Sequence, residues 1–386
     1  GLPTLPFLAL AGAAGWLGFL SGERNRAAAA KAAEPPATAA PAEEPIAAAL
    51  AMDTVRLELG YGLLSLIGDG PGARVTDQIK ALRRQLAGEL GFVMPSIRIQ
   101  DNIQLPATTY VVRVKELEAA RGEVRPGTLL VMDPQGGKIN LPGEATIEPT
   151  FGLAAMWVPA HYRDEAAVRG YTVVDPPTVV TTHLTEVIKD HLGDLLSFAE
   201  TQKLLSERGE DYKRLLADSG PARTTASGIQ RVLQGLLLER VSIRDLPLIV
   251  EAIAEAATHF QSVVPIIEHV RARLARQISN ACTGDAGHIP FIGLSAEWEQ
   301  AFAEALVGQG DERQLAMAPS RLQQFVKSLS DCLETHAMKG ELPVVVTSPP
   351  VRPFVRSVVE RFRPATVVLS HNEIHPKAKL RNLGRV

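Results

Sequence analysis

The first residues of this chain constrain its fold more than any other stretch, because they form a long apolar run without charge. Residues 2–20, LPTLPFLALAGAAGWLGFL, contain no charged side chain. As a helix they would measure about 28 Å, close to the ~30 Å of bilayer hydrocarbon. Arg24, Arg26 and Lys31 follow and no charge precedes, which places the following chain in the cytoplasm. We therefore predict a transmembrane helix over residues 1–22.

Two other interpretations of this segment stay open. A secretory signal peptide carries its positive charge before the apolar run, whereas here the charge follows it. A helix buried in a soluble core would be weakened by Pro3, Pro6, Gly12, Gly15 and Gly18. The sequence favours the membrane span over both.

The next segment, residues 23–53, differs in composition from the rest of the chain. It consists largely of Ala, Pro and Glu and has no aromatic residue. Such a sequence cannot bury enough apolar surface to fold alone. We expect a flexible linker here, followed by a folded body.

The charge and the cysteines argue against several classes of protein. The 386 residues carry a net charge of −3, whereas nucleic-acid binding needs a basic surface. The basic end, residues 377–386, is expected to be a solvated tail. Cys282 and Cys332 form no CxxC pair, so zinc and thioredoxin chemistry have no support. We expect no metal, no cofactor and no nucleic-acid partner.

Hydrophobic periodicity divides the body into regions of different fold class. Residues 55–67 are typical of a strand, and residues 74–90 of an amphipathic helix that Gly91 ends. Between about 195 and 278 the spacing is purely helical, which predicts an all-α region. Beyond residue 279 strands and helices alternate, and the last strand–helix–strand segment predicts a right-handed βαβ unit.

Hydroxyl residues mark the expected starts of three helices. A Thr near Thr182 precedes one helix, Ser295 precedes EWEQAFAEAL, and Ser348 precedes two prolines. A side-chain oxygen at such a position accepts a hydrogen bond from an otherwise unpaired backbone N–H of the first turn.

Two short patterns look like enzyme motifs but lack the context that the chemistry requires. GDGPGA, residues 68–73, fits a dinucleotide fingerprint, but no acidic residue ends the next strand about 20 positions on. HNEIHP, residues 371–376, follows a strand, whereas a zinc-binding histidine pair needs a helix, so we expect a surface loop. His183, with Asp190 and His191, is expected on an exposed helix face. With no convergent nucleophile, acid or base, we expect no enzyme.

One loop is a candidate binding site. In ATIEPTFGLAAMWVP, Phe151 lies between turn-forming residues, and loop aromatics of this kind often bind a partner. The alternative is that Phe151 fills a small core of its own. Glu148 beside it, and Thr182 at a distant helix start, would border a groove if the two segments meet.

Five stretches of the body resemble the export-gate proteins of type III secretion, most closely their flagellar members. They are GELGFVMPSIRIQDNIQLPATTYVVRVKELEAARGEVRPG, LPGEATIEPTFGLAAMWV, GYTVVDPPTVVTTHL, RVLQGLLLERVSIRDLPLIVEAIAE, and LPVVVTSPPVRPFVRSVVERF with VVLSHNEI. They occur in the family's order over residues 53–376. The resemblance is therefore far more specific than either short pattern above.

The resemblance implies a multidomain fold of α/β and α+β type, with one transmembrane helix, a linker and four cytoplasmic subdomains. The first subdomain would comprise residues 54–126 and 176–195, split by an inserted second subdomain over 127–175. A helical third subdomain would cover 196–278 and an α/β fourth 279–376, before the tail.

The resemblance also implies a function without catalysis. Family members form a cytoplasmic ring of identical subunits, typically ninefold, that docks export chaperones with bound late substrates and helps order their export. Other export-apparatus membrane proteins and the associated ATPase complex are further implied partners. The chain would lie in the bacterial inner membrane, with residues 53–386 in the cytoplasm. The equivalent gate of a virulence injectisome is the nearest alternative; a purely structural ring component and a nucleotide-binding enzyme are more distant ones.

The family's chaperone-docking site lies between the first two subdomains, and its positions correspond here to Glu148, Phe151 and Thr182. Many relatives have Asp where Glu148 stands. The extra methylene moves the carboxylate by about 1.5 Å, so its contact is expected to change.

Overall fold

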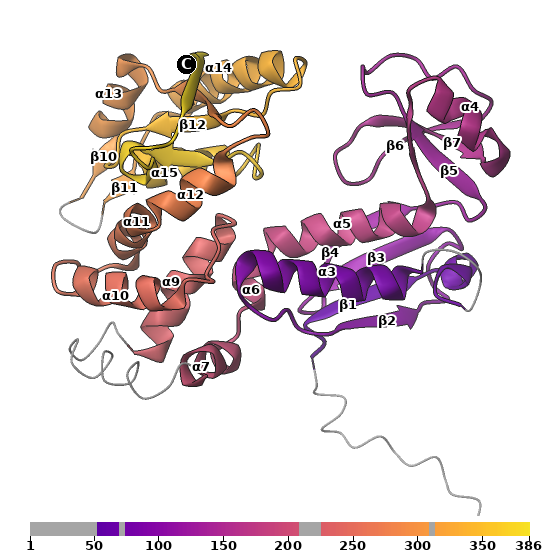
Figure 1. Ribbon diagram of the computed structural model, residues 1–386, viewed down its shortest axis with the longest axis horizontal. Coiled ribbons are helices and arrows are strands. Elements are labelled where there is room, and N and C mark those ends of the chain that lie inside the picture. Colours follow the sequence, from indigo (N-terminus) through magenta and orange to yellow (C-terminus); the bar gives the residue numbers. More distant parts are fainter. Residues whose placement is uncertain (1–51, 69–73, 208–224, 309–312) are drawn as a thin grey trace, which may run out of the picture. The chain divides into compact units, whose positions relative to one another are not determined.

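The computed structural model describes residues 52–68, 74–207, 225–308 and 313–386. The predicted transmembrane helix, nearly all of the predicted linker and most of the GDGPGA turn lie outside these ranges. Contacts divide the chain into residues 1–52 and residues 53–386, and the fold below belongs to the second unit (Figure 1). No helix within the described ranges is both long enough and apolar enough to cross a bilayer.

The first sheet, sheet 1, has four strands in the order β2-β1-β3-β4. Strand β1 pairs parallel with β2 and antiparallel with β3, and β3 pairs antiparallel with β4. Helices α3 and α5 lie side by side, and Gln78 of α3 donates a hydrogen bond to Thr178 of α5 at 3.1 Å. The elements are β1 (Val55–Leu59), η1 (Tyr61–Leu66), α3 (Val75–Leu90), β2 (Ile97–Asp101), β3 (Thr109–Val114), β4 (Leu117–Glu123) and α5 (Pro176–Asp190).

The predicted helix over 74–90 is confirmed, and the predicted strand over 55–67 is too long. Gly91 ends α3 in the left-handed conformation at φ +86°. Strand β1 stops at Leu59 because the chain turns tightly against the next loop at Gly60. A Cβ on Gly60 would lie 2.1 Å from the carbonyl oxygen of Pro106, so only glycine fits there.

The cap of helix α5 lies at Asp175, seven residues before Thr182, near which the sequence interpretation placed it. The carboxylate of Asp175 accepts a hydrogen bond from the Thr178 N–H at 3.0 Å, and two prolines occupy the first turn. Thr182 is therefore an interior residue of the helix rather than its cap. An interior position fixes Thr182 on a rigid element.

The second sheet, sheet 2, is antiparallel, with strands in the order β6-β7-β5-β8. Neighbouring residues of β5 serve different cores: Val131 belongs to a small core under α4, whereas Leu130 belongs to the large core shared with sheet 1. The elements of this region are β5 (Thr128–Met132), β6 (Glu144–Ile147), β7 (Ala154–Pro159), η2 (Ala160–Tyr162), α4 (Arg163–Val168) and β8 (Thr172–Val174).

The helical region that follows confirms the purely helical periodicity. Helix α9 buries Ile229, Val232 and Leu236 at helical spacing, and α10 and α11 pack against it. The described helices are α6 (Leu192–Leu195), α7 (Phe198–Ser206), α9 (Ala226–Leu238), α10 (Leu246–Ala257), α11 (Val263–Arg273) and α12 (Ala275–Cys282).

The third sheet, sheet 3, is all parallel, with strands in the order β13-β12-β9-β14. The unit β12-α15-β13 is the predicted βαβ unit, and Ser295 caps α13 as predicted. The elements are β9 (Ile289–Gly293), α13 (Ala296–Glu304), β10 (Leu306–Val307), β11 (Gln314–Leu315), α14 (Pro319–Ala337), β12 (Val344–Thr347), α15 (Arg352–Val359), β13 (Val368–Ser370), η4 (His371–Glu373) and β14 (Leu380–Arg385).

Two expectations for this region are wrong. Residues 377–386 are not a solvated tail, because β14 pairs with β9 and the side chains of Leu383 and Val386 pack on the core. Ser348 does not cap a helix: its hydroxyl donates to the Glu299 carboxylate, and α15 begins only at Arg352. A basic composition thus conceals an edge strand whose charged side chains face outward.

Six buried or part-buried charged side chains join the helical region to sheet 3. We name this group the ionic network. Arg352 donates to Glu239 at 2.6 Å and to Glu268 at 2.6 Å, and Arg271 pairs with Glu373. Arg271, Arg352 and Glu373 are each 1% exposed. The members are Glu239, Glu268, Arg271, Arg352, Arg356 and Glu373.

The network also fixes the ionisation of its carboxylates. Burial disfavours the charged form of Glu239, but the charges of Arg271, Arg352 and their neighbour Arg356 outweigh it and lower its pKa to about 2. For Glu268 burial dominates and raises the pKa, although Arg352 opposes the shift. Three arginines and three glutamates balance each other, which is the condition for keeping such charges out of water.

Candidate functional site

The loop between β6 and β7 is closed by the side chain of Glu148. One carboxylate oxygen, Oε1, accepts the N–H of Thr150 at 2.9 Å, and Oε2 accepts the N–H of Phe151 at 2.6 Å. The backbone of Glu148 also bonds to Gly152 and Leu153, and Gly152 adopts φ +69°. Because Glu148 is only 5% exposed, its charge is used inside the loop.

This loop presents Phe151 to solvent. The ring is 62% exposed, and the neighbouring Leu153 is 52% exposed. The alternative that Phe151 fills a small core of its own is therefore wrong, since the core beside β5 and β7 forms without it. An exposed aromatic held on a hydrogen-bonded loop is pre-ordered for contact with a partner.

The three residues singled out from the sequence line a single groove of about 390 Å³, which we name the Phe151 groove. Sheet 2 supplies one wall, with Glu148 and Phe151, and α5 supplies the other, with Thr182. Among the described residues, the half-buried hydroxyl of Thr182 has no hydrogen-bond partner. Apolar side chains complete the lining, including Leu130, Met132, Leu153, Val174 and Val179.

A buried polar pair lies in sheet 1 and α5, close enough to Glu148 to sense its charge. The hydroxyl of Tyr110 and Nδ1 of His183 are 2.8 Å apart. Burial raises the pKa of Tyr110 and the negative charge of Glu148 adds to this shift. Burial lowers the pKa of His183, against the effect of Glu148, so the imidazole is neutral at pH 7. The expectation that His183 lies on an exposed helix face is wrong, because only 8% of it is exposed.

The sequence interpretation missed one acidic residue of the groove. Asp133 follows β5 and lines the groove with its carboxylate half-buried. Its Oδ1 accepts the N–H of Gln135 at 2.8 Å, and no described residue bonds to Oδ2. Since both oxygens of Glu148 are engaged, Asp133 is the acid able to meet a partner's cation. The sequence DPQGG, residues 133–137, is typical of a turn, but it does not show that Asp133 faces the groove.

The expectation that residues 371–376 form a surface loop holds only in part. Glu373 is buried, bonds to Ser370 and belongs to the ionic network. In the described ranges, no group of three or more His, Cys, Asp or Glu side chains could hold a metal ion. The motif's acidic residue therefore has a structural partner in Arg271.

Comparison with known proteins gives the fold and the site a context. The chain matches the FHIPEP family over residues 1–379. It is 56% identical over 389 aligned positions to the flagellar biosynthesis protein FlhA of Caulobacter vibrioides, covering 100% of this chain and 56% of that protein. FlhA of Bacillus subtilis is 35% identical, covering 89% of this chain and 51% of the relative. The chain thus spans about half the length of the curated relatives it matches.

Solved structures match the same body. The Chlamydia pneumoniae CdsV protein, solved in complex with CdsO, superposes with a TM-score of 0.76 at 26% identity, over 87% of this chain and 98% of that one. The nonameric EPEC SctV-C, solved by cryo-EM, gives a TM-score of 0.67 at 20% identity over 87% and 98%. The second likeness concerns the fold alone.

Fold and relatives together define the class: a mixed α/β export-gate domain of type III secretion, as the sequence resemblance implied. The chain belongs to the FHIPEP family, whose members are export-gate proteins and not enzymes.

Proposed function

We propose that this chain is part of a flagellar type III protein export gate, and that the Phe151 groove docks export chaperones carrying late substrates. The observation that carries the proposal is the exposed ring of Phe151, held over an apolar groove by its own loop. Exposed aromatics that a partner can desolvate contribute a large share of binding energy. Sequence similarity to flagellar relatives supports the flagellar assignment over a virulence injectisome.

The chemistry of the groove defines what a chaperone must present. An apolar side chain would pack on Phe151 and Leu153, displacing water from both. The unpaired hydroxyl of Thr182 would take a hydrogen bond, and the free oxygen of Asp133 would favour a nearby cation. An apolar contact with one polar partner on each wall gives both affinity and selection.

The remaining parts of the assignment concern assembly and location. The nonameric state of EPEC SctV-C supports a ring of this chain, and the CdsV–CdsO complex supports a further protein partner. We propose that the ring works with other export-apparatus membrane proteins and an associated ATPase complex. Residues 1–22 would hold it in the bacterial inner membrane, with residues 53–386 in the cytoplasm.

Calorimetric titration of the chain with a flagellar chaperone–substrate complex tests the proposal. We expect Phe151→Ala to weaken binding by roughly 30-fold, about 2 kcal/mol. The melting temperature should not change, because the ring contributes little to the core.

Val168→Ala is the matched control, since Val168 lies on α4, is 88% exposed and does not line the groove. Unchanged affinity of Phe151→Ala, or an equal loss in Val168→Ala, would contradict the docking proposal. Binding of injectisome chaperones in place of flagellar ones would favour the injectisome gate instead.

A further inference from the structure

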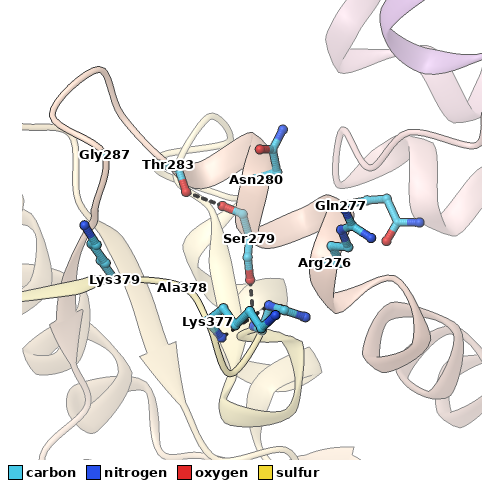
Figure 2. Close-up of a pocket in the computed structure, with 10 residues that line it drawn as sticks. Arg276, Gln277, Ser279, Asn280, Thr283, Gly287, Lys377, Ala378 and Lys379 are labelled. Carbon is cyan, nitrogen blue, oxygen red and sulfur yellow. Dashed lines mark hydrogen bonds between the residues drawn. The ribbon is translucent and has the colours of Figure 1, made fainter.

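A second, larger cleft lies away from the Phe151 groove, between α12 and the segment that leads into β14. It has a volume of about 900 Å³, and we name it the basic cleft. One wall is the outer face of α12, with Arg276, Asn280 and Thr283, and the other carries Lys377 and Lys379 (Figure 2). Neither wall belongs to the site proposed above, and the argument that follows does not depend on it.

The two walls are fastened to each other by one buried side chain. The hydroxyl of Ser279, which is 3% exposed, accepts the N–H of His375 at 2.8 Å and donates to the Glu373 carbonyl at 3.2 Å. Glu373 in turn pairs with Arg271 in the ionic network. The cleft is therefore a fixed feature of the fold, with its geometry set by buried contacts.

The cations of the basic cleft have no counter-charge within the part of the chain that the structure describes. Arg276, Lys377 and Lys379 form no ion pair with a described residue, and no acid lines the cleft. The carboxylate at its edge, Asp245, is occupied by the Gln277 amide at 3.0 Å and by the first turn of α10. In a chain of net charge −3, this surface is a local excess of positive charge.

The arrangement of the cations indicates the shape of the anion. Lys377 lies in a turn that the Ala378 N–H closes on the His375 carbonyl at 2.8 Å, and Lys379 directly precedes β14, so the two lysines leave the segment at different points. Figure 2 shows Lys379, Lys377 and Arg276 spaced along the cleft rather than converging on one point. A compact anion such as phosphate would meet one of them at a time, whereas an extended polyanion would meet all three.

We propose that the basic cleft binds an extended acidic peptide segment of a partner protein. Asn280 lies among the cations, and its amide would bond to the peptide backbone. Gln277 and Thr283 already donate to Asp245 and to the Ser279 carbonyl, so their side-chain oxygens would act as acceptors of peptide N–H groups. A nucleic acid strand fits less well, because none of the described residues that line the cleft is a Phe, Tyr or Trp for base stacking.

Fluorescence anisotropy with the full chain tests the proposal. The probe is a short labelled peptide of alternating Glu and Gly, compared with the same peptide carrying Gln at every Glu position. We expect the acidic peptide alone to bind, and raising salt from about 0.1 M to about 1 M to abolish binding as the screening length falls from about 10 Å to about 3 Å.

The double variant Lys377→Gln, Lys379→Gln should weaken the acidic peptide by roughly five- to tenfold, and Arg276→Gln by about threefold. Lys327→Gln, an exposed lysine of α14 outside the cleft, is the matched control and should bind as the parent does. Circular dichroism melts establish that each variant is folded.

Four outcomes would overturn the proposal. The neutral peptide binds as well as the acidic one, or the cleft variants lose no more affinity than Lys327→Gln. In the third, a labelled oligothymidine binds more tightly than the acidic peptide, which would indicate nucleic acid. In the fourth, inorganic phosphate competes with the peptide at equal charge concentration, which would indicate that the cleft binds a compact anion and not an extended peptide.

Discussion

The Phe151 groove and the ionic network are both places where distant segments of the chain meet, but they are built from opposite chemistry. The groove brings β6–β7 and α5 together over a partly buried apolar lining and leaves two apolar side chains exposed, Phe151 at 62% and Leu153 at 52%. The network brings α11, α15 and η4 together through charges that are nearly all out of water. The groove leaves apolar surface available to a partner, whereas the network pairs its charges with each other.

The difference shows which contacts can change without loss of the fold. Apolar contacts in the groove are non-directional, so another protein can supply the missing half. Buried charges permit no such exchange, because separating Arg352 from its carboxylates would leave them unpaired in a low-dielectric interior. We therefore expect variants of the network to alter stability and variants of the groove to alter binding.

The largest expected effect follows from Arg352→Met. The change removes the arginine that pairs with Glu268 and one of those that pair with Glu239, which keeps Arg271 at 3.2 Å. Buried carboxylate charge is thus left only partly compensated. We expect a loss of about 3–5 kcal/mol in the free energy of unfolding. Urea unfolding monitored by circular dichroism measures it. Arg363→Met, which breaks the solvent-exposed pair with Glu334, should cost less than about 1 kcal/mol; equal losses would contradict the distinction.

The decrease in the free energy of unfolding at acid pH is the next largest expected effect. The folded pKa of Glu239 is about 2, against about 4.3 for an unfolded glutamate. Between these values the unfolded state binds a proton that the folded state does not, so stability decreases as pH falls. We expect a decline on the order of 2–3 kcal/mol from about pH 5 to pH 2, which Glu268, with its raised pKa, opposes.

Urea unfolding over that pH range compares the parent with Glu239→Gln. The variant is less stable at neutral pH, because a neutral amide replaces the charge facing Arg271 and Arg352. Its stability should depend less steeply on pH than the parent's. A slope identical to the parent's would mean that other carboxylates govern the acid response.

Glu148→Gln tests whether this residue acts through the loop. A glutamine amide supplies one acceptor where the carboxylate supplies two, so one of the N–H groups of Thr150 and Phe151 loses its partner. We expect chaperone affinity to fall about tenfold, or about 1.4 kcal/mol, through a less ordered Phe151.

The comparison with Asp133→Asn separates the two acids of the groove. Asp133 offers a free oxygen, so we expect its replacement to weaken binding about threefold and to reduce the dependence of affinity on salt. The loss in Glu148→Gln should persist at high salt. If the salt dependence changed only in Glu148→Gln, Glu148 would be the contact residue and our interpretation of the loop would be wrong.

Tyr110→Phe is expected to change the stability of the fold less than either variant of the ionic network. The change leaves His183 without the hydroxyl at 2.8 Å in a buried site, at a cost of about 1 kcal/mol. Thermal melting measures the loss, and Tyr61→Phe, at a 67% exposed position, should melt as the parent does. A much larger loss would show that polar contacts below the groove are as indispensable as those of the network.

Local signals accounted for much of the fold. Apolar spacing identified α3 and α9, Gly91 marked the end of α3, and Ser295 marked the start of α13. Each depends on residues within a few positions of one another. The meeting of Glu148 and Phe151 with Thr182 came from family resemblance, because no local rule brings residues 31 positions apart into one groove.

Long-range polar contacts were the features that sequence reasoning missed. Arg352 and Glu239 are 113 positions apart. From the sequence, each charged side chain would be expected on the exposed face of a helix. The same holds for Glu373, whose partner Arg271 lies 102 positions away. Strand β14 was missed because its basic side chains resemble a tail and its pairing with β9 is a distant contact. Charge alone does not distinguish a solvated side chain from a neutralised one.

The modest core of sheet 2 has a consequence for how the protein responds to heat. Apart from residues shared with sheet 1, that core consists of Val131, Ile139, Leu141, Val158 and Ala166. The hydration of ions becomes less favourable on warming, so the penalty for burying the arginine–glutamate cluster shrinks as temperature rises. We therefore expect sheet 2, and with it the proposed docking face, to unfold on warming before the helical region and sheet 3 separate.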